Sequence, residues 1–226
     1  MGRTLGLIPC RGGSKGIRRK NVQPVAGEPL LAHTVRASLD ADGVDRTVVS
    51  TDDDEIAEAA QEAGADVPFA RPAELATDEA PTEPVIEHAL EYLRDEAGET
   101  YDTVVLLQAT SPLRNATHVD EALARYDSEG ADSLVAVSED HSYRWRRTGD
   151  GAERINYDSR TRRQEKEPEY VESGALYAVD AAQFLETGDL QVGRTALYVL
   201  DDVAAFDIDE PFELWLADKI LREWEQ

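Results

Sequence analysis

Short apolar runs alternate with amphipathic stretches of helix length along most of the chain. The strand-length runs are 5–8, 47–49, 104–107 and 134–137, and the helix-length stretches between them are 30–39, 56–63, 85–93 and 119–126. This alternation is typical of βαβ units, whose parallel strands form one sheet covered by helices on both faces. We therefore predict an α/β fold with a Rossmann-like, mostly parallel sheet. Ligands of such sheets bind beyond the carboxyl ends of the strands.

The length of the chain predicts one domain over residues 1–226, interrupted by a single excursion. The alternating pattern stops between His141 and Glu172, where the sequence is polar and rich in arginine, and strand character returns at Gly174. We predict that residues 141–172 form a protruding arm. A closing helix is expected from Pro211, with apolar residues at helical spacing as far as Trp224.

A glycine-rich loop dense in cations follows the first apolar run. Residues 10–21 read Cys-Arg-Gly-Gly-Ser-Lys-Gly-Ile-Arg-Arg-Lys-Asn, and they hold two of the only four lysines in the chain. Glycines permit positive φ angles and let backbone N–H groups approach an anion, and crowded positive charge is unfavourable unless an anion compensates it. We predict a phosphate-binding loop, with an ordinary turn as the alternative. The spacing fits neither a Walker A motif nor a dinucleotide-binding motif.

Two groups of carboxylates are candidate metal ligands. Asp207 and Asp209 alternate just before the closing helix, which is the kind of paired oxygen site that Mg²⁺ uses together with phosphate oxygens. The alternative is that Asp209 only caps the helix. For the acidic run 52–55, the favoured interpretation is the N-terminus of a helix, with Asp52 kept as a reserve ligand.

The charge balance limits the possible partners. With 47 acidic and 23 basic residues, the net charge of −24 argues against binding to nucleic acid or to an anionic membrane, and it suggests adaptation to high salt. A single cysteine, Cys10, excludes an intramolecular disulfide, and we expect a cytoplasmic protein. Seven arginines of the arm and five cations of the loop could together attract an anion, or the arm arginines could pair with neighbouring glutamates or with a second subunit.

With these motifs in view, the chain resembles the acylneuraminate cytidylyltransferases, also called CMP-sialic acid synthetases. The resemblance runs nearly from end to end, and the segments that carry it are 8–16 with Lys20-Asn21, 50–52, 71–78, 107–114, 163–164, 174–177 and 207–209.

The resemblance implies a role for each matching residue. The triphosphate of CTP would contact Arg11, Ser14, Lys15, Lys20 and Asn21, and its cytosine end would contact Arg71 and Thr82. The sugar acid would face Gln108, Arg144, Arg163 and Tyr177, and Mg²⁺ would be held by Asp207 and Asp209. Catalysis would depend on Arg11, Lys15, Lys20 and Asp209. In this family the arm reaches across a homodimer into the site of the partner.

The reaction implied is the transfer of CMP from CTP to a nine-carbon 2-keto sugar acid, a sialic, legionaminic or related nonulosonic acid, with release of pyrophosphate. Ser173 stands where the family commonly has asparagine beside the sugar, which leaves the substrate open. The acidic composition would suit a member from a salt-adapted archaeon. The alternatives are a cytidylyltransferase for the shorter sugar acid Kdo and a non-catalytic nucleotide-binding protein on the same fold.

Overall fold

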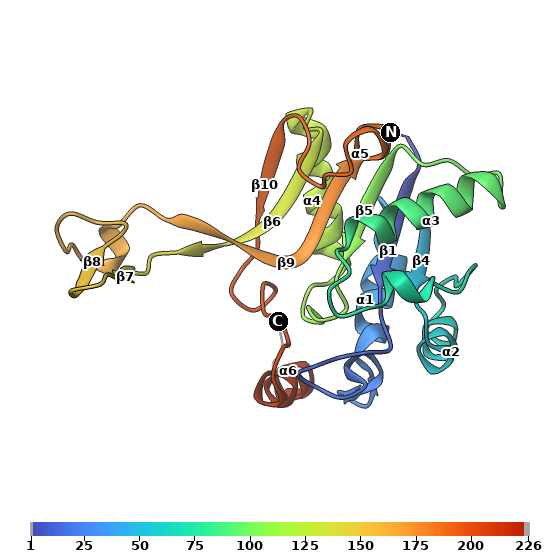
Figure 1. Ribbon diagram of the computed structural model, residues 1–226, viewed down its shortest axis with the longest axis horizontal. Helices are drawn as coiled ribbons and strands as arrows, with labels where there is room; N and C mark the ends of the chain where they lie inside the picture. Colours follow the sequence, from blue (N-terminus) through green and yellow to red (C-terminus); the bar gives the residue numbers. More distant parts are fainter. Residues whose placement is uncertain (1, 224–226) are drawn as a thin grey trace.

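The computed structural model describes residues 2–223, and a six-stranded sheet runs through its centre (Figure 1). The strand order is β10-β6-β9-β5-β1-β4, and only β9 runs antiparallel to its neighbours. The strands are β1 (Thr4–Pro9), β4 (Arg46–Ser50), β5 (Thr103–Leu107), β6 (Ser133–Asp140), β9 (Glu169–Asp180) and β10 (Thr195–Val199). The predicted mostly parallel sheet is therefore confirmed.

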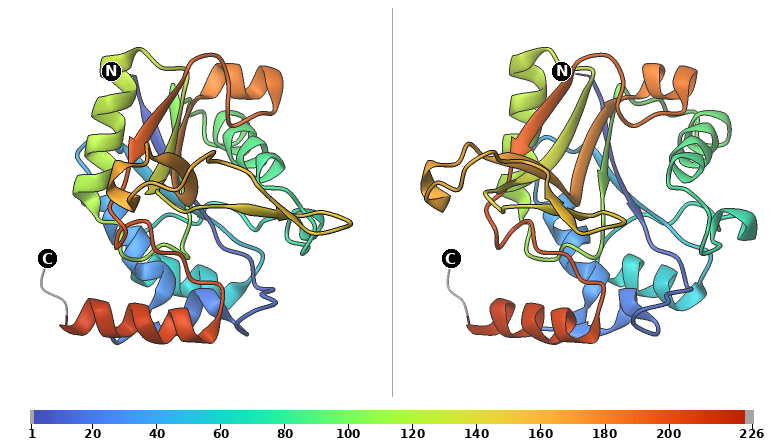
Figure 2. Two further views of the ribbon diagram at one scale, coloured as in Figure 1. Left: turned by 90° about the vertical axis from the view of Figure 1, so that its left-hand side faces the viewer. Right: turned by 60° about the vertical axis from the view of Figure 1, so that its left-hand side comes forward.

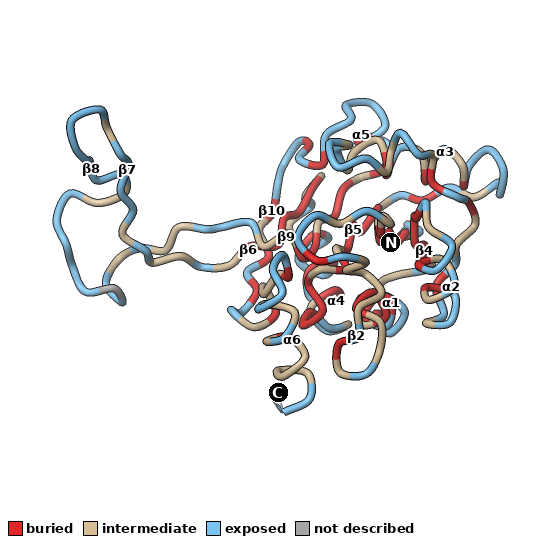
Figure 3. Tube along the Cα trace, turned by 60° about the horizontal axis from the view of Figure 1, so that its bottom comes forward, coloured by how far each residue is buried: buried red, intermediate tan, exposed pale blue. Residues whose placement is uncertain are grey.

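Successive side chains of the central strands enter two cores, one on each face of the sheet. Val105 and Leu107 pack with one group of helices, whereas Val104 and Leu106 pack with the other, because side chains alternate between the faces of a strand. The first face is covered by α1 (Leu30–Leu39), α2 (Asp54–Glu62) and α4 (Ala116–Glu129), and the second by α3 (Glu83–Asp95) and α5 (Ala181–Thr187). Figure 2 shows the helices on both sides of the sheet, and Figure 3 shows that its strands carry much of the buried chain.

The course of the chain around β1 positions the site. From β1 the chain passes through α1 to β4 on one side, and then through α2, the short turn η2 (Ala73–Leu75) and α3 to β5 on the other side. The connections thus diverge next to β1, which opens a crevice beyond the carboxyl ends of β1 and β5.

The arm differs from the prediction in one boundary. Strand β9 begins at Glu169, where its first four residues pair with residues 137–140 of β6, so the prediction that strand character returns only at Gly174 is wrong. The two strands extend past the helices and their outer residues are largely exposed, so this pairing leaves no apolar pattern in the sequence. Beyond them lie the hairpin β7 (Trp145–Arg147) and β8 (Ala152–Arg154) and the turn η3 (Arg163–Glu165), which project to the left in Figure 1.

A third, smaller core attaches the phosphate loop to the end of the chain. Ile17 of the loop packs with Ile208 and with Ala217 of α6 (Pro211–Glu223). The turn η1 (Lys20–Val22) and the hairpin β2 (Pro24–Val25) and β3 (Glu28–Pro29) connect the loop to α1. Trp224, predicted in the closing helix, lies outside the described residues. Among residues 2–223, no helix is long and apolar enough to cross a membrane.

Candidate functional site

A cavity of about 390 Å³ opens beyond the carboxyl ends of β1 and β5. It brings together all of the residues assigned to CTP in the sequence and two other predicted site residues. Its lining includes Arg11, Ser14, Lys15, Lys20, Asn21, Arg71 and Thr82, with Gln108 and Asp209. A second cavity of about 320 Å³ shares Thr82 and Gln108 with the first and contains Tyr177. The two cavities adjoin at Thr82, just before α3, and at Gln108, just after β5.

The glycines of the phosphate loop are not needed for positive φ angles, in contrast to the prediction. Gly12, Gly13 and Gly16 all have negative φ, and the positive φ in this loop belongs to Arg19, at 57°. Two of these positions instead require glycine because atoms of Asp209 and Asp53 lie too close for a side chain. A Cβ atom at Gly16 would lie 2.3 Å from the carbonyl oxygen of Asp209, and one at Gly12 would lie 2.8 Å from a carboxylate oxygen of Asp53.

Four of the five loop cations are paired with carboxylates of the protein, so the premise that their charge lacks a compensating anion is wrong for these four: Arg11, Lys15, Arg19 and Lys20. Asp78, in the segment between η2 and α3, lies 2.8 Å from Nη1 of Arg11 and 3.4 Å from Nζ of Lys15. Arg11 also donates to the carbonyl of Thr77 at 2.7 Å. A carboxylate of the protein therefore binds the cations expected to hold the triphosphate. Sequence analysis did not assign Asp78 a role, although it ends a segment that carries the family resemblance.

Two further cations, Arg19 and Lys20, anchor the loop at its carboxyl-terminal end through ion pairs. Arg19 binds the carboxylates of Asp53 and Glu55, and this hydrogen bonding holds the pKa of Asp53 below its ordinary value. Lys20, largely buried, donates to the carbonyl of Ile208 at 2.6 Å and lies 3.2 Å from Asp209. The loop is thereby fixed between α2 and the segment before α6.

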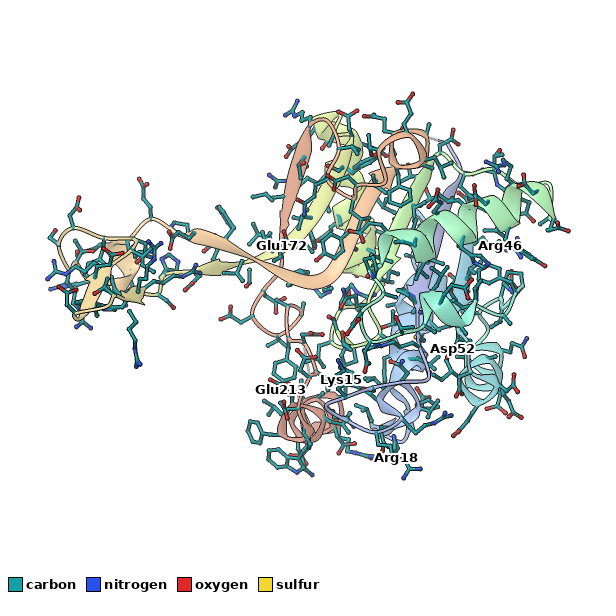
Figure 4. All side chains as sticks on the ribbon, in the orientation of Figure 1. Lys15, Arg18, Arg46, Asp52, Glu172 and Glu213 are labelled. Atoms are coloured by element: carbon teal, nitrogen blue, oxygen red, sulfur yellow. The ribbon has the colours of Figure 1, made fainter. Side chains whose placement is uncertain are left out.

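The acidic run after β4 behaves as the favoured interpretation predicted. Asp53 is the N-cap of α2, accepting from the backbone N–H of Ile56, and Asp54 and Glu55 lie in the first turn. Asp52 instead accepts from the backbone N–H of Gly12 at 2.9 Å, which attaches this run directly to the phosphate loop (Figure 4).

Arg71 forms a buried wall of the first cavity. Its side chain donates to the hydroxyl of Ser50 at 3.0 Å and to the carbonyl of the same residue. Burial lowers the pKa of Arg71, and it raises the pKa of the neighbouring Cys10 thiol to about 12. Cys10 is therefore a packed, neutral side chain rather than a nucleophile.

Arg114 ends the segment 107–114 that carries the family resemblance, although sequence analysis assigned it no role, and it lies buried behind Gln108. Its Nη2 atom donates to the hydroxyl of Thr34 at 3.1 Å and to the carbonyl of Gln108 at 3.4 Å. Burial lowers the pKa of Arg114 to about 10, which leaves the guanidinium charged at neutral pH. Arg114 thus connects α1 to the backbone of a residue that faces both cavities.

A β-bulge in β9 directs two polar side chains of that strand, Glu172 and Tyr177, into the second cavity. Residues 172 and 177 are separated by an odd number of positions, so a regular strand would direct them to opposite faces. The register between β6 and β9 shifts at this point, and Gly174 adopts a φ of 74°. This β-bulge places Glu172 and Tyr177 on the same cavity, with the hydroxyl of Tyr177 donating to Glu172 at 3.2 Å.

The two predicted metal ligands have different surroundings. Asp207 accepts from the hydroxyl of Ser111 at 3.3 Å, whereas the carboxylate of Asp209 is largely exposed next to Lys20. Asp209 does not cap α6 with its side chain, because Glu213 accepts from the backbone N–H groups of Asp209 and Glu210. Within residues 2–223 no group of three or more acidic, histidine or cysteine side chains could hold a metal. A pair of carboxylates remains compatible with a magnesium ion that takes its other ligands from phosphate and water.

No described residue between 141 and 168 of the arm lines either cavity of its own chain. Arg144 pairs with Asp140, and Arg146 lies 3.3 Å from Glu153, so the alternative of local pairing with acidic neighbours is confirmed for Arg146. Arg163 begins η3 on the arm, and its side chain is outside the described part of the structure. Of the possibilities left open for the arm arginines, a common site with the loop cations of the same chain is therefore not formed by the described arm residues that line neither cavity.

A doubly covered α/β sheet whose carboxyl edge carries a cationic glycine loop is typical of nucleotide-binding proteins. A family model described as Cytidylyltransferase matches residues 5–214. The chain belongs to this cytidylyltransferase family.

Among relatives, the chain is 33% identical to the N-acylneuraminate cytidylyltransferase of Escherichia coli over 94% of this chain and 51% of that protein. It is 35% identical to N-acylneuraminate cytidylyltransferase B of Danio rerio, over 96% of this chain and 51% of the relative. The chain thus spans about half the length of these curated relatives. The CMP-N,N'-diacetyllegionaminic acid synthase of Legionella pneumophila is 33% identical and matches over nearly full length, 97% of this chain and 96% of the relative.

Two solved structures share the fold. A CMP:2-keto-3-deoxy-manno-octonic acid synthetase complexed with CTP superposes with a TM-score of 0.70 at 18% identity, over 98% of this chain and 99% of the other. A 4-diphosphocytidyl-2C-methyl-D-erythritol synthase from Anaerococcus prevotii gives 0.71 at 11% identity, over the same shares. These likenesses concern the fold alone.

Proposed function

We propose that this chain transfers CMP from CTP to a nonulosonic acid. The anomeric hydroxyl at C2 of the sugar acid attacks the α-phosphorus of CTP, the bond to the β-phosphate oxygen breaks, pyrophosphate leaves, and the hydroxyl proton passes to solvent or a neighbouring base. The observation that carries the proposal is the pair of adjoining cavities, one with the phosphate loop and Arg71, the other with Tyr177, both bordered by Gln108.

The residues of the chain act mainly by positioning and by charge. Arg11 and Lys15 reach the cavity from the phosphate loop, where they would bind the triphosphate in exchange for Asp78. Lys20 is held against Ile208 and would stabilise charge that develops on the leaving pyrophosphate. Asn21 supports the loop by donating to the carbonyl of Arg11 at 3.1 Å. Fixed donors of this kind favour the transition state because they need no reorganisation during the reaction.

A magnesium ion is part of the proposal. Asp207 and Asp209 would hold it: Asp209 lies 3.2 Å from Lys20 of the phosphate loop, and Asp207 stands two residues earlier on the same segment. A bound ion would supply charge neutralisation at the phosphates. Lys20 shares Asp209 and would keep that carboxylate oriented toward the loop.

A homodimer would complete the site. None of the described residues that line the second cavity is basic, although the sugar acid carries a carboxylate. Arg144 and Arg163, on the projecting arm, are the cations that the family resemblance assigns to the sugar, and they would enter the site of the partner.

Subunit complementation tests this arrangement. Lys15→Ala and Arg163→Ala dimers, each inactive alone, are mixed, allowed to exchange subunits and assayed. If the arm acts in the partner's site, one site of each mixed dimer keeps both residues, and roughly one quarter of the wild-type activity returns. If each arm serves its own chain, no site is complete and no activity returns.

Release of pyrophosphate tests the function itself. The protein is incubated with CTP, Mg²⁺ and molar KCl, with N-acetylneuraminic, legionaminic, pseudaminic or Kdo acid supplied in parallel. Turnover with a nine-carbon acid supports the proposal, turnover with Kdo alone favours the shorter substrate, and CTP binding without turnover favours a non-catalytic nucleotide-binding protein.

We also propose that the protein works at high salt in a cytoplasm, as in a salt-adapted archaeon. The support is its net charge of −24, which needs strong screening, and a reaction that consumes CTP.

A further inference from the structure

The second cavity contains a carboxylate that is fixed in place from two sides. The hydroxyl of Tyr177 donates to one oxygen of Glu172 at 3.2 Å, and the side-chain amide of Gln191 donates to the other at 3.2 Å. Gln191 lies in the connection between α5 and β10, far from β9 in sequence. Glu172 is thus held between two separate parts of the fold, and Figure 4 shows it on β9 at the base of the arm.

The two supporting residues are themselves fixed. The backbone N–H of Gln191 donates to Asp189 at 2.9 Å, which shapes the connection. Burial, with the nearby charges of Glu172 and Asp207, raises the pKa of Tyr177 to about 12, so its hydroxyl keeps its proton and remains a donor. Each carboxylate oxygen of Glu172 has further lone pairs, since such an oxygen accepts more than one hydrogen bond.

The negative charge of the second cavity determines which chemical groups it can bind. Its described lining contains three acidic residues, Glu83, Glu172 and Asp189, and no basic one. A carboxylate or phosphate is repelled there, whereas hydroxyl, amide and ammonium groups are attracted as donors. If a sugar acid occupies this cavity, the part that meets Glu172 is a donor-bearing part remote from its own carboxylate.

We propose that Glu172, held by Gln191, determines specificity by accepting a hydrogen bond from a hydroxyl or N–H group on the sugar acid. The substrate class is then a polyhydroxylated or N-substituted sugar acid with a donor at this position, and an analogue without that donor is rejected. This inference rests on the proposed function, because it assigns a part of the same substrate to the second cavity. Glu172 is exposed in the chain as described, so the substrate itself would have to cover it. A hydrogen bond to a charged acceptor is stronger than one between neutral groups, and an analogue that lacks the donor forfeits it.

The test combines variants of the protein with variants of the substrate. Glu172→Gln removes the charge and keeps the shape, Gln191→Leu removes one support, and Glu62→Gln makes the same charge change on the exposed face of α2 as a control. The values of kcat and KM are measured with N-acetylneuraminic or legionaminic acid, whichever the wild type uses, and with analogues that each lack one hydroxyl or carry a methylated amide.

We expect Glu172→Gln to raise KM for the sugar acid about tenfold and to leave KM for CTP unchanged. One analogue should already be poor with the wild type and lose little more with Glu172→Gln, because the substitution weakens the same charged hydrogen bond that this analogue cannot form. Gln191→Leu should act in the same direction on that analogue, and Glu62→Gln should change neither constant.

The inference is overturned if Glu172→Gln weakens all analogues equally, or weakens none, while the wild type is active. A wild type that binds CTP but turns over no sugar acid would instead overturn the proposed function, and this inference with it.

Discussion

Replacing Asp78 by asparagine should tighten the binding of CTP. In the structure Asp78 binds Arg11 at 2.8 Å and Lys15 at 3.4 Å, so a triphosphate that binds as proposed would have to displace this carboxylate from both cations. The substitution Asp78→Asn keeps the size of the side chain and removes the competing charge. An internal competitor lowers the apparent affinity in proportion to its occupancy, so its removal should raise affinity.

The size of this effect follows from exposure. The side chains of Arg11, Lys15 and Asp78 are 32%, 72% and 40% exposed, so solvent screens both pairs. Exposed ion pairs contribute at most about 1 kcal/mol, and for two pairs that share one carboxylate we expect roughly that total. The dissociation constant of CTP should therefore fall roughly fivefold in Asp78→Asn.

Isothermal titration with CTP would measure the change, with and without Mg²⁺, at about 0.1 M and about 1 M KCl. The gain should shrink at 1 M, where the Debye length is about 3 Å. Glu79→Gln is the matched control, since it makes the same charge change one residue away on an exposed side chain. Equal gains in affinity in both variants would mean that the effect comes from net charge alone. Weaker CTP binding in Asp78→Asn would refute the idea that Asp78 competes with CTP, and would mean that Asp78 contributes to CTP binding.

Other consequences of the structure can be measured directly. Lys15→Ala should lower kcat by about 10²–10³-fold in pyrophosphate release, since it removes a cation that would face the triphosphate; unchanged turnover would contradict the assignment. Asp53→Ala should cost about 1–2 kcal/mol in chemical unfolding, because it removes the α2 cap and the partner of Arg19. Arg19 lowers the pKa of Asp53 in the folded protein, so this stabilisation is present above the ordinary pKa of 3.8 and is lost as the pH falls through the lowered pKa. A difference in unfolding free energy between wild type and Asp53→Ala that persisted in strong acid would exclude the charge of Asp53 as its cause. Cys10, whose pKa is raised to about 12 by burial, should resist iodoacetamide at pH 8 until the protein unfolds, and mass spectrometry would reveal early labelling if the thiol were accessible. The melting temperature should rise from dilute buffer to molar KCl, and a flat response would remove the support for adaptation to high salt.

The sheet could be predicted from the sequence because its central strands are buried on both faces. The run 104–107 is apolar throughout and became β5, with alternate side chains in the two cores. The first part of β9, residues 169–172, escaped prediction for the opposite reason. It pairs with β6 outside the helical layers, so its stability comes from backbone hydrogen bonds that leave no apolar pattern.

The sequence was sufficient to predict many of the residues that form the candidate site, but not which side chains they contact. The cations and glycines of the phosphate loop were evident, yet Asp78 meets Arg11 across 66 intervening residues, and local sequence carries no sign of such a contact. The glycines illustrate the same limit, because Gly16 is required by the carbonyl of Asp209 and not by its own φ angle. Glu172 was missed because a bulge reverses the face on which it lies.

The exposure of the loop cations suggests how an acidic protein can bind a polyanion in strong salt. Salt weakens exposed pairs most, so the contacts of Asp78 with Lys15 and Arg11 should loosen as KCl rises, and so should any exposed contact of these cations with CTP. Lys20 differs, since its side chain is only 13% exposed and donates to a backbone carbonyl that salt does not screen away. Salt therefore weakens two sets of exposed contacts of Arg11 and Lys15 together: those with Asp78 and those proposed with CTP. The contact of CTP with the less exposed Lys20 should depend least on ionic strength. Affinity for CTP should then change less with salt in the wild type than in Lys20→Ala, and a steeper dependence in the wild type would contradict this division of roles.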